Sequence, residues 1–145
     1  MITNEVQYRA TKAHLAKFEE AVANLEAAGG DPAGAKLRSL ELDALRSQAA
    51  DLRAEVDEYE QLRAGTLTTF EATSLPELAT ALVKARISKG WTQRQLAEQL
   101  GVAEQQVQRY ESTGYASASL ARLGDIAAAL GARVREVVTL DTDAA

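Results

Sequence analysis

Residues 93–114 read QRQLAEQLGVAEQQVQRYESTG, and they decide the fold because their small and aliphatic residues are spaced for two helices that cross closely. Ala97 would leave room for the second helix to approach the first without a side chain between them. Gly101 can adopt the left-handed backbone that ends a helix and turns the chain. Val107 then lies on the apolar side of the second helix. The spacing predicts a helix, a tight turn and a second helix over residues 103–113.

With this motif the sequence resembles the lambda-repressor-like, or Xre, family of DNA-binding proteins, in which the second helix lies in the major groove. The resemblance covers about residues 75–131. The residues that carry it are Arg86, Thr92-Gln93, Ala97, Leu100-Gly101-Val102 and Arg109-Tyr110-Glu111. Ala103 departs from the family, which often has Ser or Thr there. We therefore expect the recognition helix to lack a side-chain cap, a loss of about 1 kcal/mol.

The resemblance implies that the outward face of the second helix reads base edges. Gln105 and Arg109 are the main candidates, because Gln pairs bidentately with adenine and Arg with guanine. Glu104 can accept a hydrogen bond from cytosine, and its charge would also exclude wrong sequences. The alternative is a solvated helix face. The residues expected to contact bases are Glu104, Gln105, Gln106, Gln108 and Arg109.

Contacts to the DNA backbone are expected at the start of the first helix and in the loop after the second. Gln93 resembles the family residue that meets a phosphate together with the free amides of its helix N-terminus. Arg86 and Glu111 resemble the family's internal ion pair, and Tyr115 could either touch DNA or pack under its loop. The residues expected to contact phosphates are Thr92, Gln93, Arg94, Thr113, Ser117 and Ser119.

Composition excludes several classes of protein. The chain of 145 residues is 46% hydrophobic and 26% charged, which suits one ordinary domain or two small ones. It has no long apolar run and no leader-like start, so we expect no membrane contact and a cytoplasmic location. There is no cysteine, and His14 is the single histidine. We expect no metal, no cofactor and no enzymatic activity, since no phosphate-binding loop or supported acid–base pair is present.

The net charge of −5 is divided unevenly along the chain. Residues 1–74 hold 8 basic and 13 acidic residues, and residues 75–131 hold 6 basic and 5 acidic residues. Residues 132–145 hold 2 basic and 3 acidic residues. A DNA-binding domain with so little positive charge depends on where its charges lie. Its affinity should fall as salt rises, because phosphate contacts release counterions.

Two apolar stripes with heptad spacing predict a helical hairpin over residues 1–64. Residues 29–34, GGDPAG, separate the stripes and predict a turn that folds the second helix back antiparallel. Leu37, Leu40 and Leu62 fall off the seam and are expected to leave surface that a second copy of the chain covers. A solvated spacer and a docking surface for another protein are the alternatives. The stripe residues are Tyr8, Thr11, Leu15, Phe18, Val22 and Leu25, then Leu42, Leu45, Ala49, Leu52, Val56 and Tyr59.

Four or five short helices are expected over residues 74–131. Ser74 and Glu77 form the pattern of a capping box, and Thr92 with Gln95 repeats it. The last helix should begin after Ser117 or Ser119 and end at Gly131. Its expected buried residues are Leu120, Leu123, Ile126, Ala127 and Leu130.

Residues 65–73 and 132–145 have a strand-like composition. In the second segment Val134, Val138 and Leu140 recur at even spacing. We interpret the two segments as a small two-stranded β ribbon, formed within one chain or across a dimer. The alternative is a linker and a frayed tail.

These patterns predict an all-α protein: a hairpin for dimerisation or partner docking, a linker, a DNA-binding domain and a C-terminal strand or tail. The expected function is a sequence-specific regulator of transcription, a dimeric repressor that binds double-stranded DNA. The alternative is an antitoxin, because the layout is also reminiscent of HigA-type antitoxins. Such a protein would hold a toxin through its N-terminal helices and repress its own operon.

Overall fold

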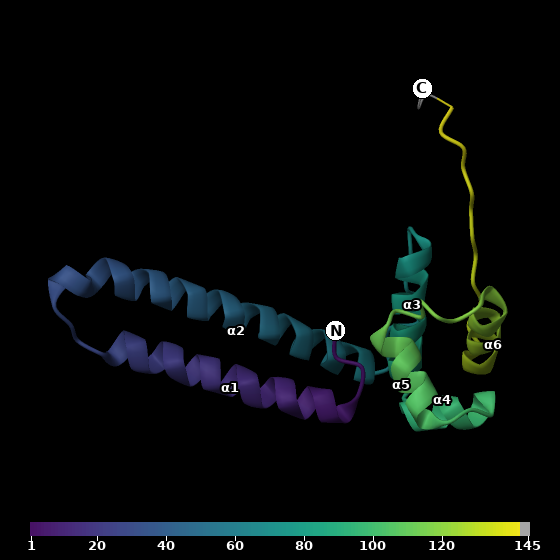
Figure 1. The fold of residues 1–145 in the computed structure, drawn as a ribbon, viewed down its shortest axis with the longest axis horizontal. Coiled ribbons are helices and arrows are strands. Elements are labelled where there is room, and N and C mark those ends of the chain that lie inside the picture. The colour runs from purple at the N-terminus through teal and green to yellow at the C-terminus, as the bar shows by residue number, and fades with distance from the viewer. Residues whose placement is uncertain (143–145) are drawn as a thin grey trace.

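The computed structural model describes residues 1–142, and within them the chain is all-helical, as predicted (Figure 1). Two long helices form an arm, and four shorter ones gather at its base. Residues 143–145, the end of the predicted tail, lie outside the described residues. The elements are α1 (Glu5–Ala27), a 3-10 turn η1 (Pro32–Gly34), α2 (Ala35–Arg63), α3 (Leu75–Ser88), α4 (Gln93–Leu100), α5 (Glu104–Ser112) and α6 (Leu120–Leu130).

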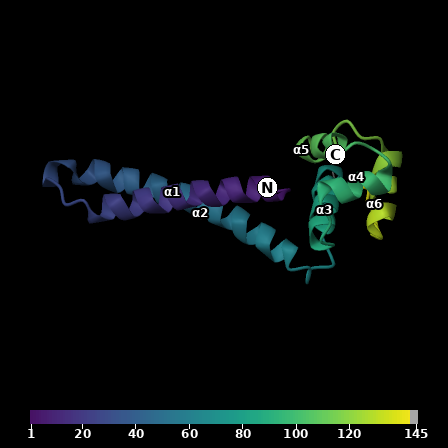
Figure 2. The same cartoon turned by 90° about the horizontal axis from the view of Figure 1, so that it is seen from below.

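The arm, made of α1, η1 and α2, is the predicted antiparallel hairpin (Figures 1 and 2). Asn4 caps α1, because its side chain accepts a hydrogen bond from the Gln7 amide at 2.9 Å. Asp31 does the same for the turn by accepting from the Ala33 amide at 3.1 Å. Every residue of both predicted stripes is buried or half-buried, so the heptad seam is confirmed.

The three leucines off the seam differ in their exposure. Leu37 and Leu40, near the turn, are 64% and 59% exposed, as expected. Leu62 is only 2% exposed and belongs to the buried cluster that also contains Val83 and Ile87 of α3. The prediction that Leu62 leaves free surface is therefore wrong. The last turn of α2 packs against α3, and this contact covers a residue that lies off the α1–α2 seam.

Side-chain caps begin three of the four short helices. Ser74 accepts from the Glu77 amide at 3.3 Å, and the Glu77 carboxylate turns back to Thr73. Hydrogen bonds from the Thr73 amide and hydroxyl lower the pKa of the Glu77 carboxyl. Thr92 forms a full capping box with Gln95. Ser119 accepts from the Arg122 amide at 3.1 Å, so it starts α6.

The helix group, α3 to α6, encloses one core. Leu96, Val107 and Ile126 are 0% exposed at its centre. Gly101 and Gly131 both end their helices with a left-handed φ of 68°. Leu120 was expected to be buried and is 77% exposed. As the first residue of α6, it lies before the turn of helix that faces the core.

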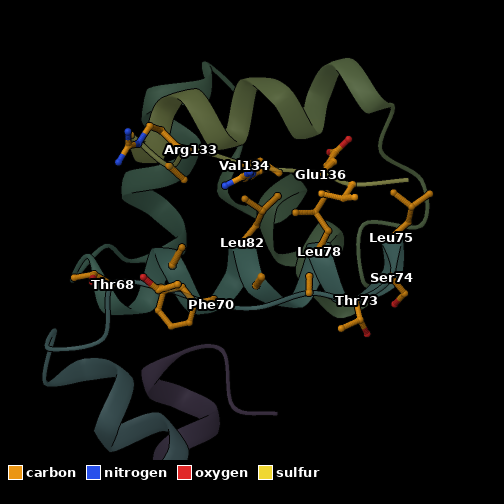
Figure 3. A pocket seen from close by; sticks show the side chains of 18 of the residues that line it. Thr68, Phe70, Thr73, Ser74, Leu75, Leu78, Leu82, Arg133, Val134 and Glu136 are labelled. Carbon is orange, nitrogen blue, oxygen red and sulfur yellow. The ribbon is translucent and has the colours of Figure 1, made fainter. Parts of the chain in front are cut away.

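The predicted within-chain ribbon is wrong. Residues 65–73 and 132–142 contain no strand, and parts of both, within residues 68–73 and 132–138, line one groove along α3. Figure 3 shows the reason: Leu75, Leu78 and Leu82 of α3 lie between the two segments and keep their backbones apart. Within residues 1–142, no helix has the length and apolar content needed to cross a membrane.

Candidate nucleic-acid interface

The site begins with the crossing of α4 and α5. Ala97 is 2% exposed at this contact, and the left-handed Gly101 turns the chain directly after α4. The Val102 amide donates to the Ala97 carbonyl at 3.0 Å, which closes the end of the helix. Ala103 makes no side-chain cap for α5, as predicted. The turn fixes the direction of α5, so that the apolar side of α5 faces α4.

The opposite side of α5 carries the predicted base-contacting residues. Glu104, Gln105, Gln108 and Arg109 are exposed, and Gln106 is half-buried at the edge. The Gln108 amide lies 3.4 Å from the Glu104 carboxylate, to which it donates. Among residues 1–142, no acidic side chain lies within ion-pair distance of Arg109. The arrangement leaves a row of amides and one guanidinium open to a ligand.

Five of the six predicted phosphate-contacting residues are exposed: Thr92, Arg94, Thr113, Ser117 and Ser119. Some of their polar groups already have partners within the chain. The Thr92 and Ser119 hydroxyls accept the capping hydrogen bonds of α4 and α6, and Thr113 donates to the Arg109 carbonyl at 2.9 Å. Arg94 pairs with Glu98 at 3.3 Å on the surface. Exposed pairs of this kind are weak, so Arg94 can turn to a phosphate at little cost.

Gln93 differs from the other five because its side chain points inward. It is 5% exposed, and its amide nitrogen donates to the Glu111 carboxylate at 2.8 Å. Its amide oxygen accepts from Asn4 at 3.2 Å. The buried Glu111 carboxylate needs several donors, and Gln93 supplies one of them. The Gln93 side chain is thus engaged within the chain, and its contact with a phosphate stays a prediction.

Arg86 and Glu111 form the buried ion pair that the resemblance implies. The guanidinium donates twice to the carboxylate, at 2.5 Å from Nε and 2.9 Å from Nη2. The side chains are 3% and 0% exposed. Arg86 also donates to the Trp91 carbonyl at 2.6 Å. The pair thus joins α3 to α5 and to the segment before α4, and so holds the recognition helix in place.

Sequence reasoning missed the role of the first residues. The Thr3 carbonyl accepts from Arg86 at 2.6 Å, across 83 residues of sequence, and Ile2 is 2% exposed. The only local signal was an apolar residue at position 2 just before the Asn4 cap. A groove of about 400 Å³ separates this segment from the edge of α5, with Glu104 and Gln108 on its far side. The base of the arm therefore borders the recognition helix.

The loop after α5 is supported from beneath by Tyr115. This residue has a left-handed φ of 59°, is 4% exposed and stacks on Tyr110 with ring centroids 5.6 Å apart. Burial raises the pKa of the Tyr115 hydroxyl, which has no hydrogen-bond partner within the described chain. The sequence left open whether Tyr115 touches DNA or packs under the loop, and in the structure it packs under the loop. Trp91 is half-buried and also packs against the core.

Positive charge at the interface comes from few groups. In the helix group, Arg86 is buried, Lys84 pairs with Glu58 at 2.7 Å and Arg122 lies 3.7 Å from Asp125. Arg94 and Arg109 are the cations on the α4–α5 surface, and the N-termini of both helices add partial positive charge. No cluster of potential metal ligands occurs among residues 1–142.

The capped α4, the left-handed turn and the polar-faced α5 define a helix-turn-helix, the class of fold that presents a helix to DNA. Residues 82–137 match the family model described as helix-turn-helix. The match supports a DNA-binding regulator of transcription, a regulatory rather than an enzymatic class. No curated protein and no solved structure matches the chain.

Proposed function

We propose that the protein is a sequence-specific transcription regulator that binds double-stranded operator DNA as a dimer and represses by occupying the promoter. One observation carries the proposal: α5 has its apolar side fixed in the core and its polar side open. Val107 is 0% exposed on the inner side, whereas Gln105 and Arg109 stand free on the outer side. A rigid helix with this division is suited to the major groove.

The proposed contacts follow the exposure of each group. Arg109 would pair with a guanine and Gln105 with an adenine, because both are bidentate donors or acceptors of the right shape. Arg94 and the first amides of α4 would bind the phosphate backbone. In this proposal Gln93 contributes its main-chain amide, because its side chain is engaged with Glu111.

Dimeric binding is proposed because a single α5 offers few base-reading groups and the helix group has little net positive charge. Two copies on a two-fold site add their contact free energies. The half-sites of such dimers lie about one helical turn of DNA apart, or a multiple of it. The expected operator is therefore a palindrome.

We assign the arm, residues 1–64, to docking of a protein partner and residues 74–131 to DNA binding. The arm projects well away from the helix group (Figure 2), and its sequence carries most of the acidic excess. This protruding acidic arm favours a second candidate function, an antitoxin that holds a basic toxin. A small basic reading frame beside the gene would support that candidate, and its absence would count against it.

The proposal is tested by selecting bound duplexes from a random DNA pool at low salt with the full chain. A palindromic consensus is expected, because two copies read inverted half-sites. Arg109→Ala should relax the preference at one base position of each half-site. Arg122→Ala is the matched control, since Arg122 lies on α6 next to Asp125. A pool that shows no enrichment for any sequence would overturn the proposal.

A further inference from the structure

A groove of about 950 Å³ runs along α3, and no residue of α4 or α5 lines it (Figure 3). Residues 68–75 form one side and residues 131–138 the other. Leu75, Leu78 and Leu82 form its floor, and Leu75 is 68% exposed. Leu78 is half-buried and Leu82 is only 4% exposed, so the apolar floor is uncovered mainly at its Leu75 end.

The C-terminal side of the groove is an extended segment with no partner. Val137, Val138 and Leu140 are 79%, 92% and 84% exposed, and Val134 is 44% exposed. Within the described chain, no backbone–backbone hydrogen bond involves residues 133–142. An extended edge with free amides and carbonyls is a template for another strand. The exposed apolar side chains and the unpaired backbone amides and carbonyls of this segment are both suited to a second strand that binds in the groove.

We propose that a second copy of the chain fills this groove. The C-terminal segments of two copies pair antiparallel about a two-fold axis at Val137, and each strand lies over the α3 helix of the other copy. The inference deepens the dimer of the proposed function by naming its interface. Because both partners are the same chain, each would cover the other's groove in the same way.

The sequence of the segment selects this register. With Val137 opposite the partner's Val137, Arg133 faces the partner's Asp141 and Val134 faces the partner's Leu140. Opposite charges and apolar pairs across two strands are stabilising.

Neighbouring registers are worse. An axis at Arg135 or at Glu136 places two like charges directly opposite each other, which is destabilising. The axis at Val137 sets Glu136 against the partner's Val138, and an axis at Val138 sets Glu136 against the partner's Leu140. The axis at Val138 also lets Arg135 face the partner's Asp141, but it leaves Val138 opposite the partner's Val138 as the single apolar pair. Of these four registers, only the axis at Val137 combines two ion pairs with three apolar pairs.

One face of the paired strands is mostly apolar and the other carries the charged pairs, as a strand that lies over α3 requires. Residues at even positions include Val134, Val138 and Leu140, with Glu136 as the charged member, and they share one face. Val134 is the least exposed of these apolar residues and lies beside Leu82 in Figure 3, so this face turns toward α3. Arg133 and the partner's Asp141 then meet on the solvent face.

The arm offers no comparable patch for a second copy. Its seam is used between α1 and α2, and its exposed large apolar residues beyond Met1 are Val6, Leu37 and Leu40. Val6 lies at the base of the arm, and Leu37 and Leu40 lie near its turn, so the three do not form one surface. Contiguous apolar area, rather than scattered residues, marks an interface.

Crosslinking through single cysteines tests the interface directly, since the chain has no cysteine of its own. Val137→Cys places one thiol on the proposed axis, and Leu40→Cys is a matched control on the arm. Mild oxidation of the full chain should convert the Val137→Cys protein to a covalent dimer and leave the Leu40→Cys protein monomeric on a non-reducing gel. Crosslinking at position 40 but not at 137 would overturn the proposal. A wild-type chain that sediments as a monomer at every concentration would do so as well.

A charge exchange tests the register. Arg133→Asp should weaken the dimer about tenfold by replacing two attractions with two repulsions. The double variant Arg133→Asp, Asp141→Arg should restore it. Both positions are exposed, so circular dichroism should show unchanged helicity. A double variant as weak as the single one would rule out this register.

DNA binding separates this inference from the proposed function. If the wild type dimerises through position 137 and binds no duplex, the function fails and the interface stands. If selected operators bind but the dimer forms elsewhere, the function stands and this interface fails.

Discussion

The arm and the helix group use apolar residues in different ways. In the arm most stripe residues, such as Leu42 and Leu45, are only half-buried along one seam. In the helix group, Leu96, Val107 and Ile126 are completely enclosed. A repeating stripe is thus enough to specify two long antiparallel helices. The short helices instead depend on caps at their starts and on one shared core.

The arm is also fixed more firmly at one end than at the other. The buried residues of α2 are Val56, Tyr59 and Leu62, all among its last eight residues. The rings of Tyr8 and Tyr59 pack in a tilted arrangement with centroids 5.1 Å apart, and the Tyr8 hydroxyl donates to the Glu60 carboxylate at 2.6 Å. The base of the arm belongs to the core of the helix group, whereas the turn at residues 28–34 contains no buried residue. We therefore expect stability to decrease from the helix group to the far end of the arm.

The largest effect is expected for the ion pair that joins the two regions. Glu111→Ala leaves the Arg86 guanidinium buried without its carboxylate, which should lower the free energy of unfolding by about 3 to 5 kcal/mol. Thermal and urea denaturation measure it. Glu98→Ala, which breaks the exposed pair with Arg94, is the control and should cost no more than about 0.5 kcal/mol. Equal, small losses for both variants would mean that the Arg86 pair adds little.

Truncating one leucine in each region sharpens the comparison. Leu96→Ala should cost about 2 to 5 kcal/mol, because it opens a cavity in a closed core. Leu45→Ala removes a half-buried side chain from the seam and should cost about 1 kcal/mol. Urea unfolding of both variants gives the order. If the Leu45→Ala protein lost more stability than the Leu96→Ala protein, the arm would be the more tightly packed region.

A smaller effect separates the two arginines of the interface. Arg109→Ala should reduce discrimination between operator and scrambled duplex by about 1 to 3 kcal/mol. Arg94→Ala should weaken binding to both duplexes alike and lower the salt dependence by about one ion. Titrations at several salt concentrations measure both quantities. If Arg109→Ala weakened both duplexes equally, that residue would contact only the phosphate backbone.

The smallest effect concerns Tyr115, whose hydroxyl is buried without a partner. Tyr115→Phe should change stability at neutral pH by less than about 1 kcal/mol. Burial raises the pKa of Tyr115 in the folded chain. Above about pH 10 the unfolded chain therefore releases a proton that the folded chain keeps, and stability falls.

Urea midpoints at neutral and alkaline pH measure this loss, which should be smaller in the Tyr115→Phe protein. Burial also raises the pKa of Tyr59, so Tyr59→Phe is the parallel test in the arm. An alkaline loss of stability as large in the Tyr115→Phe protein as in the wild type would contradict the assignment.

The sequence predicted what depends on local pattern. The heptad stripes, the caps at Thr92 and Ser119, and the turn at Gly101 follow from spacing and residue type over a few positions, and the structure confirms them. The Arg86–Glu111 pair followed from the family resemblance. Which of the exposed α5 residues read bases remains a prediction.

What the sequence could not predict depends on contacts between distant segments. Gln93 turns inward because Asn4 and the buried Glu111 carboxylate both bind its amide. Leu62 is buried near the end of α2, and α2 packs against α3 as well as α1. The extended segments beside α3 have strand-like sequences, but the leucines between them prevent pairing within one chain. Each outcome was decided by tertiary packing, which residue spacing does not encode.

The arm is long enough to turn a small tilt at its base into a measurable displacement at its far end. α2 has 29 residues, and at about 1.5 Å of rise per residue it is a rod of about 43 Å. A tilt of about 5° at the base would shift the far end by about 4 Å, a displacement that distance measurements between spin labels can resolve. Labels near the turn would therefore report a loosened Thr3–Arg86 hydrogen bond before any helix melts.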